Sequence, residues 1–405
     1  MADELEARRA EAVQATGFDT TLALADAQWV TGDITGAQER YEQAWESARN
    51  ETERWCAWTG LAEVDPEEAW QRFATQPFTR EASQLPPDDY YTALLAVGTA
   101  AGQFKATADA VAAGLAKEKV GATVSGRRFS GRMTPPPSWR GGRPGLPPGV
   151  RGPHGLPPRS RYRATRPRAS VSGNTLTAGP QLWGWVAALD LLAEEPSAAE
   201  RALGQLKEHR DPELTIAALY QAAAGRAPAH TRAVSARLSG KASARLGKAA
   251  AGTGLWTRAT QVVTQRVASA PSATLCLEAW LEAMQALPES LDKQSTAAAD
   301  TLTAACLQGL VKRAGSSGAL ISAMNRVTST LASRGAARRW PWTERFFLGL
   351  LEAAKARNAT PEALKQAVTN MTGTMTRSGL SEETTSEFRQ AVEKICPECV
   401  TPKKG

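Results

Sequence analysis

Hydrophobic residues recur every three or four positions along most of this 405-residue chain, which is the pattern of amphipathic helices. Trp183, Val186, Leu189 and Leu192 mark one such face, which ends before Pro196. Ser197-Ala198-Ala199-Glu200 has the form of a capping box and predicts the start of the next helix. Further helices are predicted near 3–16, 22–29, 37–48, 55–64, 212–224, 256–269, 272–287, 292–313, 317–333, 342–357, 361–371 and 381–395. Asp65-Pro66-Glu67-Glu68 predicts the start of one more, with Asp at the N-cap and Pro in the first helical position. No alternating strand pattern occurs, so the sequence predicts an all-α fold.

One stretch, Gly126–Arg168, breaks this pattern. It holds 11 Arg, 10 Pro and 8 Gly, and no Asp, Glu or Lys. Its few apolar residues follow no period, and its prolines disfavour helix and central strand. Ordering such a segment costs about 1–2 kcal/mol per residue, with little apolar burial to offset it. We therefore predict a disordered linker over 119–178 that separates a helical domain (1–118) from a second one (179–395), with a tail over 396–405.

The charge of this linker suggests one function and admits two plainer explanations. The whole chain carries a net charge of +7. The 11 linker arginines alone carry +11, so the rest of the chain is net negative. Mobile polycations of this kind bind nucleic acid without sequence preference. The same composition is also typical of a linker that is charged only to stay soluble, and of a GC-rich gene read out of frame. The nucleic-acid hypothesis names as contacts Arg127, Arg128, Arg140, Arg161 and Arg163.

The first 118 residues contain a repeated helical hairpin. Leu24 and Ala25 lie on its first helix, and Gly32-Asp33-Ile34 forms its turn. Three residues then share one face of the second helix: Ala37, Tyr41 and Ala44. Ala69 and Phe73 repeat the Ala–aromatic spacing 32 residues after Ala37 and Tyr41, and a third, looser pass runs from 88 to 113.

These hairpins resemble tetratricopeptide repeats. In that pattern small alanines allow two helices to approach closely, and the aromatic ring fills the hole between them. The resemblance implies an α-solenoid whose concave face binds an extended peptide or a partner helix. The tryptophans of this block lie at helical spacing, and we expect most of them in the core: Trp29, Trp45, Trp55, Trp58 and Trp70.

A basic stripe stands out in the second block. Leu214 to Leu277 contains no acidic residue. Within it four cations lie +4, +4 and +3 apart, on one helix face: Arg237, Lys241, Arg245 and Lys248. Because like charges at this spacing repel, the stripe points to an acidic partner, which would be a phosphate backbone, an anionic surface or a Glu-rich neighbouring helix. The alternative is a solvated face, and Gly240 and Gly247 argue against a continuous helix.

The sequence offers no catalytic, cofactor-binding or metal-binding constellation. The three histidines lack a partner at any recognisable motif spacing. Cys396-Pro397-Glu398-Cys399 has no second cysteine pair to complete a zinc site, so we interpret it as incidental thiols, with an intersubunit zinc or a thiol switch as alternatives. The other cysteines are scattered, which fits a reducing compartment better than a disulfide framework.

The leading hypothesis is a non-enzymatic, cytoplasmic scaffold that binds protein partners through its N-terminal solenoid. It needs no cofactor and has no membrane span, since no apolar run approaches 18 residues. The alternative is a nucleic-acid-binding protein that uses the linker and the Arg237–Lys248 stripe.

Overall fold

The computed structural model describes residues 17–80, 85–118, 179–205, 212–228, 234–269, 272–332 and 335–400, and every regular element among them is helical. The all-α fold class is therefore confirmed. The predicted linker over 119–178 lies outside the described residues, as does the predicted helix over 3–16.

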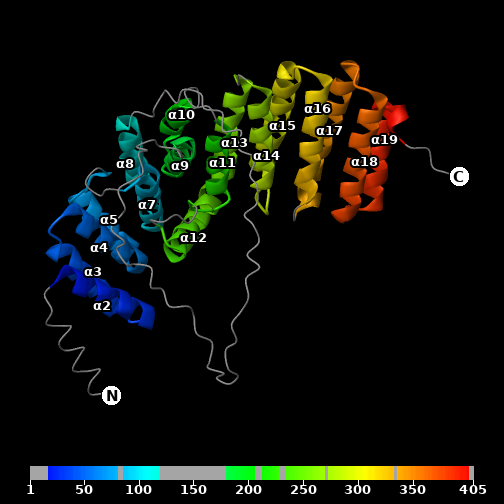
Figure 1. The fold of residues 1–405 in the computed structure, drawn as a ribbon. Coiled ribbons are helices and arrows are strands. Elements are labelled where there is room, and N and C mark those ends of the chain that lie inside the picture. Colours follow the sequence, from blue (N-terminus) through cyan, green and yellow to red (C-terminus); the bar gives the residue numbers. More distant parts are fainter. Residues whose placement is uncertain are drawn as a thin grey trace, which may run out of the picture. The chain divides into compact units, whose positions relative to one another are not determined.

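The described helices before residue 119 form three hairpins, α2/α3, α4/α5 and α7/α8 (Figure 1). Their first helices begin at Phe18, Glu51 and Pro87, so successive starts lie 33 and 36 residues apart (18, 51, 87). The predicted start at Asp65-Pro66 is confirmed, because the Asp65 carboxylate accepts hydrogen bonds from the backbone N–H groups of Glu67 and Glu68. These helices are α2 (Phe18–Thr31), α3 (Ile34–Ser47), α4 (Glu51–Val64), α5 (Pro66–Thr75), α7 (Pro87–Ala100) and α8 (Phe104–Lys117).

The described helices beyond residue 178 agree closely with the predicted positions. They are α9 (Gly179–Leu192), α10 (Pro196–Gly204), α11 (Pro212–Ala223), α12 (Ala236–Thr253), α13 (Leu255–Ala268), α14 (Ala273–Gln285), α15 (Lys293–Arg313), α16 (Ser317–Ser329), α17 (Ala336–Ala356), α18 (Pro361–Arg377) and α19 (Glu382–Ile395), with the 3₁₀ turns η2 (Thr330–Ala332) and η3 (Pro397–Cys399).

Helices α11 and α13–α19 pack in two layers. One layer contains α13, α15, α17 and α19, and the other contains α11, α14, α16 and α18; neighbours within a layer touch, and hairpins α14/α15, α16/α17 and α18/α19 join the layers (Figure 1). The first helices of these hairpins begin at Ala273, Ser317 and Pro361, so each start lies 44 residues after the one before (273, 317, 361).

Tryptophans contribute to the core, and several donate their indole N–H groups to neighbouring helices. Trp45, Trp55, Trp58 and Trp70 are buried, which confirms the prediction for most of the N-terminal tryptophans. The indole of Trp58 donates to the Ala69 carbonyl at 2.7 Å and so ties α4 to α5. In the two-layer stack, Trp280 is fully buried, stacks on Phe346 at 4.4 Å and donates to Thr303 Oγ1 at 3.1 Å. When the indole N–H of a buried tryptophan donates a hydrogen bond, the ring adds apolar burial without leaving an unpaired polar group in the core.

The helices on either side of the predicted linker belong to one compact unit. Helix α8 packs on α9, and α7 packs on α12. The domain boundaries at 118, 179 and 395 remain a prediction.

Three local details differ from the sequence predictions. Ser197 does not cap α10, because the helix already begins at Pro196 and has no side-chain cap. Helix α17 starts at Ala336 rather than near 342 and runs through Pro341. Helix α12 is continuous through Gly240 and Gly247. Gly247 lies against Gly225, whose Cβ, if it had one, would lie 2.6 Å from the Gly247 Cα. Gly247 permits this close packing against Gly225, and neither Gly240 nor Gly247 breaks α12.

Gly184 tests how closely α9 and α11 must pack. A Cβ at this position would lie 2.2 Å from the backbone oxygen of Thr215, which cannot move without shifting α11. We expect Gly184→Ala to lower the free energy of unfolding by roughly 1–3 kcal/mol in urea titrations.

Gly252→Ala is the matched control. Nothing lies within 4 Å of a Cβ at this exposed position of α12, so the substitution should stabilise by about 0.5–1 kcal/mol. Equal effects of the two substitutions would contradict the close α9–α11 contact.

Candidate functional site

Helix α12, which carries the basic stripe, lies across the N-terminal hairpins. Its apolar face, which packs against α7 and α4, consists of Leu238, Ala242, Leu246 and Ala250, all of them buried. This face repeats every four residues, so one side of the helix is covered by protein along its whole length.

Three of the four stripe residues contact the N-terminal hairpins of the same chain. The Arg237 guanidinium lies 5.2 Å from the ring centre of Trp29 on α2, a cation–π contact. Lys241 donates to the Val64 carbonyl at 2.8 Å, at the C-terminal end of α4. Such a position is favourable for a cation, because the last carbonyls of a helix carry negative partial charge.

The third contact is acidic. Arg245 Nη2 lies 3.6 Å from Glu67 Oε1, in the first turn of α5, although both side chains are largely exposed. Lys248 is exposed and makes no hydrogen bond or ion pair within the described residues. Burial and the nearby Arg237 charge lower the pKa of Lys241, whereas Asp65 and Glu63 act in the opposite direction. The sequence analysis named three kinds of acidic partner for the stripe. Among the described residues, the acidic partner is the first turn of α5, which carries Glu67.

The other residues singled out from sequence fall in two groups. The repeat residues Ala37, Tyr41, Ala44, Ala69 and Phe73 are buried, while Leu24 is half-buried. The Tyr41 hydroxyl donates to Asp26 Oδ1 at 2.7 Å, and its ring lies where a Cβ on Gly60 would go. The linker arginines lie outside the described residues: Arg127, Arg128, Arg140, Arg161 and Arg163.

A row of polar side chains crosses the layer formed by α11, α14, α16 and α18. We call it the polar row: Arg226, Glu278, Glu282, Asn325, Arg326 and Asn370. Arg326 forms a two-point ion pair with Glu278, one contact measuring 2.7 Å between Nη2 and Oε2. Asn370 donates to Asn325 at 3.2 Å. These contacts link α14 to α16 and α16 to α18; Arg326, Asn325 and Asn370 are exposed, while Glu278 is half-buried.

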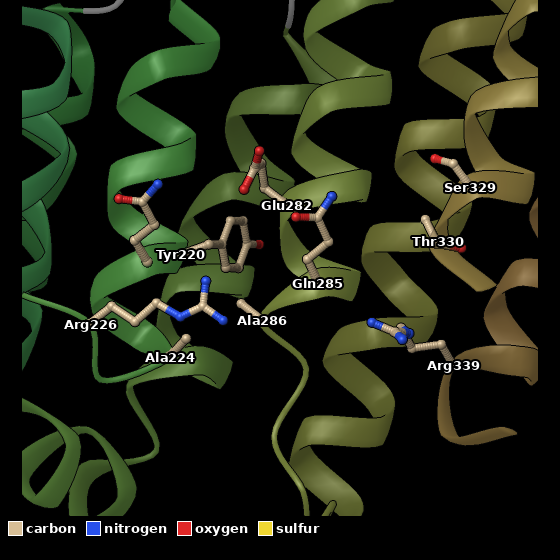
Figure 2. Close-up of a pocket in the computed structure, with 10 residues that line it drawn as sticks. Tyr220, Ala224, Arg226, Glu282, Gln285, Ala286, Ser329, Thr330 and Arg339 are labelled. Carbon is tan, nitrogen blue, oxygen red and sulfur yellow. The ribbon is translucent and has the colours of Figure 1, made fainter. Parts of the chain in front are cut away.

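At one end of the polar row lies a cavity of about 580 Å³. Its walls come from the C-terminal ends of α11 and α14, from Ser329 and Thr330 at the end of α16, and from Arg339 near the start of α17. Figure 2 shows the guanidinium groups of Arg226 and Arg339 pointing toward each other from opposite sides, with Glu282 and Gln285 between them. This volume falls within the ~300–1,000 Å³ of ordinary ligand pockets.

The two arginines differ in their surroundings. Arg226 is exposed, and its side chain makes no hydrogen bond within the described residues. Arg339 is only 3% exposed, and burial together with the neighbouring Arg338 charge lowers its pKa. Burial and Glu278 raise the pKa of Glu282, while Arg226 and Arg326 pull it down. The cavity thus holds two guanidinium groups and one partly desolvated carboxyl group.

A second cavity, of about 440 Å³, lies beside Lys105 on α8 and Ala193 after α9. Close to it, Asp190 is 4% exposed, and within the described residues its Oδ1 accepts no hydrogen bond. Lys105 Nζ is 3.9 Å from that oxygen, too far for a hydrogen bond. Burial raises the pKa of Asp190 to about 6, against the opposing charge of Lys105.

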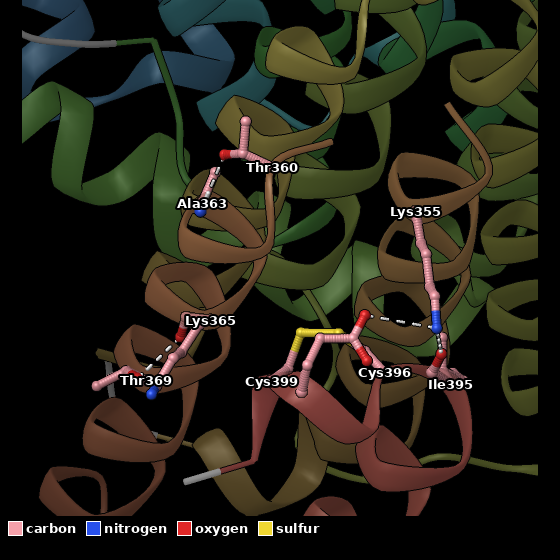
Figure 3. The surroundings of a disulfide bond; sticks show 9 residues. Lys355, Thr360, Ala363, Lys365, Thr369, Ile395, Cys396 and Cys399 are labelled. Atoms are coloured by element: carbon pink, nitrogen blue, oxygen red, sulfur yellow. Dashed lines mark hydrogen bonds and ion pairs between the residues drawn. A yellow bond between two sulfur atoms is a disulfide. The ribbon is translucent and has the colours of Figure 1, made fainter. Parts of the chain in front are cut away.

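Cys396 and Cys399 are both buried and form a disulfide (Figure 3). This differs from the incidental thiols predicted from sequence, because η3 packs the chain end against α18 and α19. Lys355 closes the same region from α17, donating to the Ile395 carbonyl at 2.7 Å and pairing with Glu398 at 3.6 Å (Figure 3). The described residues contain no group of three or more His, Cys, Asp or Glu side chains that could hold a metal ion.

Comparison with known proteins supplies no relative: no family model, no curated protein and no solved structure matches this chain. None of the described helices has both the length and the apolar character that crossing a bilayer requires.

Sequence reasoning did not find the cavity. Glu282 and Gln285 lie on α14, whereas Arg226 follows α11 and Arg339 lies on α17. The three segments share no motif, so no local pattern brings the two arginines to α14. The one available signal was the absence of acidic residues between Leu214 and Leu277, which includes Arg226 but gives no indication of its neighbours.

Charge reversal on α12 tests its docking. We expect Lys241→Glu to cost roughly 2–4 kcal/mol in urea unfolding, because it leaves the Val64 carbonyl unpaired and adds a carboxylate beside Asp65 and Glu63. Lys248→Glu reverses the same charge at an exposed position of the same helix and should change stability by no more than about 0.5 kcal/mol. Equal effects would show that α12 does not rely on Lys241.

Asp190 should make stability depend on pH. Its raised pKa means that the folded state favours the protonated acid, so its contribution to stability is fully present below the unfolded value of 3.8 and is lost as pH rises through about 6. We expect Asp190→Asn to stabilise the protein by about 1–3 kcal/mol at pH 7.5 and by much less at pH 4.

Thermal or urea unfolding at both pH values measures this difference, with Glu352→Gln at an exposed position of α17 as the control. A loss of stability in Asp190→Asn at pH 7.5 would instead mean that the Lys105 charge outweighs the burial of Asp190.

Proposed function

We propose that this protein is a non-enzymatic scaffold built on helical repeats, which binds a protein partner through the polar row. The observation that carries the proposal is the regular stacking of hairpins α14/α15, α16/α17 and α18/α19, with half-buried or exposed polar residues at matching places on their first helices. The 44-residue interval lies in the range of two-helix solenoid repeats, roughly 40–47 residues. Stacked repeats of this kind offer an extended surface to a partner.

The surface proposed here differs from the N-terminal groove suggested by the repeat resemblance. Helix α12 already packs on α4 and α7 of the N-terminal hairpins, and its own Leu238, Ala242 and Leu246 are buried. The side chains of the polar row, by contrast, remain half-buried or exposed. We therefore place the partner on α14, α16 and α18 and treat α12 as an internal ligand of the N-terminal hairpins.

Nucleic-acid binding is the competing function. Its described contacts would be the stripe on α12, of which Arg237, Lys241 and Arg245 are engaged within the chain. Only Lys248 is left without such a contact among the described residues. The described part of the molecule therefore favours a protein partner.

A selection experiment tests the proposal. Random peptides, displayed between two carrier domains so that both ends are blocked, would be selected on the full-length protein. We expect enriched peptides that bind with micromolar dissociation constants. Asn370→Arg, which places a large charged side chain on the polar row, should weaken their binding by about tenfold or more.

Thr301→Arg introduces the same residue at an exposed position of α15, in the other layer, and should leave binding unchanged. Duplex DNA and single-stranded RNA would be titrated in parallel across a salt series. No enriched peptide, together with nucleic-acid affinity that falls steeply with salt, would overturn the proposal in favour of the alternative.

A further inference from the structure

The cavity between Arg226 and Arg339 has the composition of an anion site. Two guanidinium groups face each other across it (Figure 2). Arg226 makes no hydrogen bond within the described residues, and the same holds for the exposed side-chain amide of Gln285, so both have donors available for a ligand. A guanidinium matches a carboxylate or phosphate with two parallel N–H donors.

The negative groups around the cavity limit the charge of that anion. Glu282 lies on the same wall, and α11, α14 and α16 all end at the cavity, where their last carbonyls carry negative partial charge. With Glu282 ionised, the side chains lining the cavity sum to a single positive charge. A dianionic phosphate would meet Glu282 and three helix C-termini, whereas a carboxylate carries only one charge.

The cavity also adjoins the polar row, since Glu282 and Arg226 belong to both. A chain lying along α14 and α16 would reach it without leaving the surface. We propose that this cavity binds one carboxylate group of the partner polypeptide, held between Arg226 and Arg339, with Gln285 as a further donor. This inference rests on the proposed function and specifies its ligand chemistry. The carboxylate comes from the C-terminus of the partner or from an Asp or Glu side chain.

Three pools of random hexapeptides, each labelled with an uncharged BODIPY dye that carries no free carboxylate, distinguish these sources. The first has a free C-terminus and no Asp or Glu, the second has an amidated C-terminus and one Asp or Glu, and the third has an amidated C-terminus and no acidic residue. Fluorescence anisotropy with the full-length protein should show the third pool binding at least about tenfold more weakly than the better of the other two. Whichever of these binds better identifies the source of the carboxylate.

Two substitutions should change the affinity for the preferred pool in opposite directions. Arg226→Gln removes an exposed cation and should weaken binding of the preferred pool about fivefold. Glu282→Gln removes the competing negative charge and should strengthen it by a similar factor. Arg389→Gln, at an exposed position of α19, is the control and should leave the affinity for the preferred pool unchanged. Arg339→Gln is a weaker test, because the residue is buried and its loss affects folding.

The failures of the two proposals are distinguishable. If all three pools bind equally, or if Arg226→Gln and Glu282→Gln have no effect, the carboxylate site is wrong, while peptides selected on the polar row still support the scaffold function. If Glu282→Gln weakens binding instead, the cavity recognises a cation. If no pool binds, the carboxylate site is also wrong, and the peptide selection decides the scaffold function separately.

Discussion

The contact between α12 and the N-terminal hairpins joins sequence segments that lie more than a hundred residues apart. Its centre is apolar, with Leu238 and Leu246 buried, and three cations on one side of the helix fix its position. Lys241 is the most telling of these, because a lysine that lies partly buried must recover its hydration energy from a specific acceptor, here the Val64 carbonyl. With the α8–α9 contact, this docking makes one compact unit of helices that the sequence appeared to divide.

This arrangement changes the meaning of the basic stripe. Like charges at helical spacing weaken an isolated helix, which is why the stripe suggested an external acidic partner. Three of its members instead lie against an aromatic ring, a helix C-terminus and a glutamate of the same chain. A test of nucleic-acid binding that reverses these charges would therefore also disturb the fold. Lys248, which has no such contact among the described residues, separates the two effects.

Most helices could be predicted because their signals are local. Asp65-Pro66 starts a helix, as these two residue types predict, and the spacing of apolar residues located α13 to α16 and α19 within a few positions. Helix α18 runs to Arg377, beyond the predicted end near 371. Gly247 misled because its low helix propensity is overridden by packing: α12 runs through Gly247, which lies against the backbone of Gly225. Helix α17 begins at Ala336 rather than near 342 and runs through Pro341. The cavity could not be predicted, since Arg226, Glu282 and Arg339 come together only after α11 has packed beside the hairpins α14/α15 and α16/α17.

The central claim is that the residues before and after the predicted linker form one folded unit, held by α12 on α7 and by α8 on α9. Its most direct test is to produce residues 1–118 and 179–405 as separate chains in the same cell and to measure the mass of the purified material by light scattering. The account predicts a stable one-to-one complex that elutes as a single species. Two chains that purify separately, each folded, would contradict it.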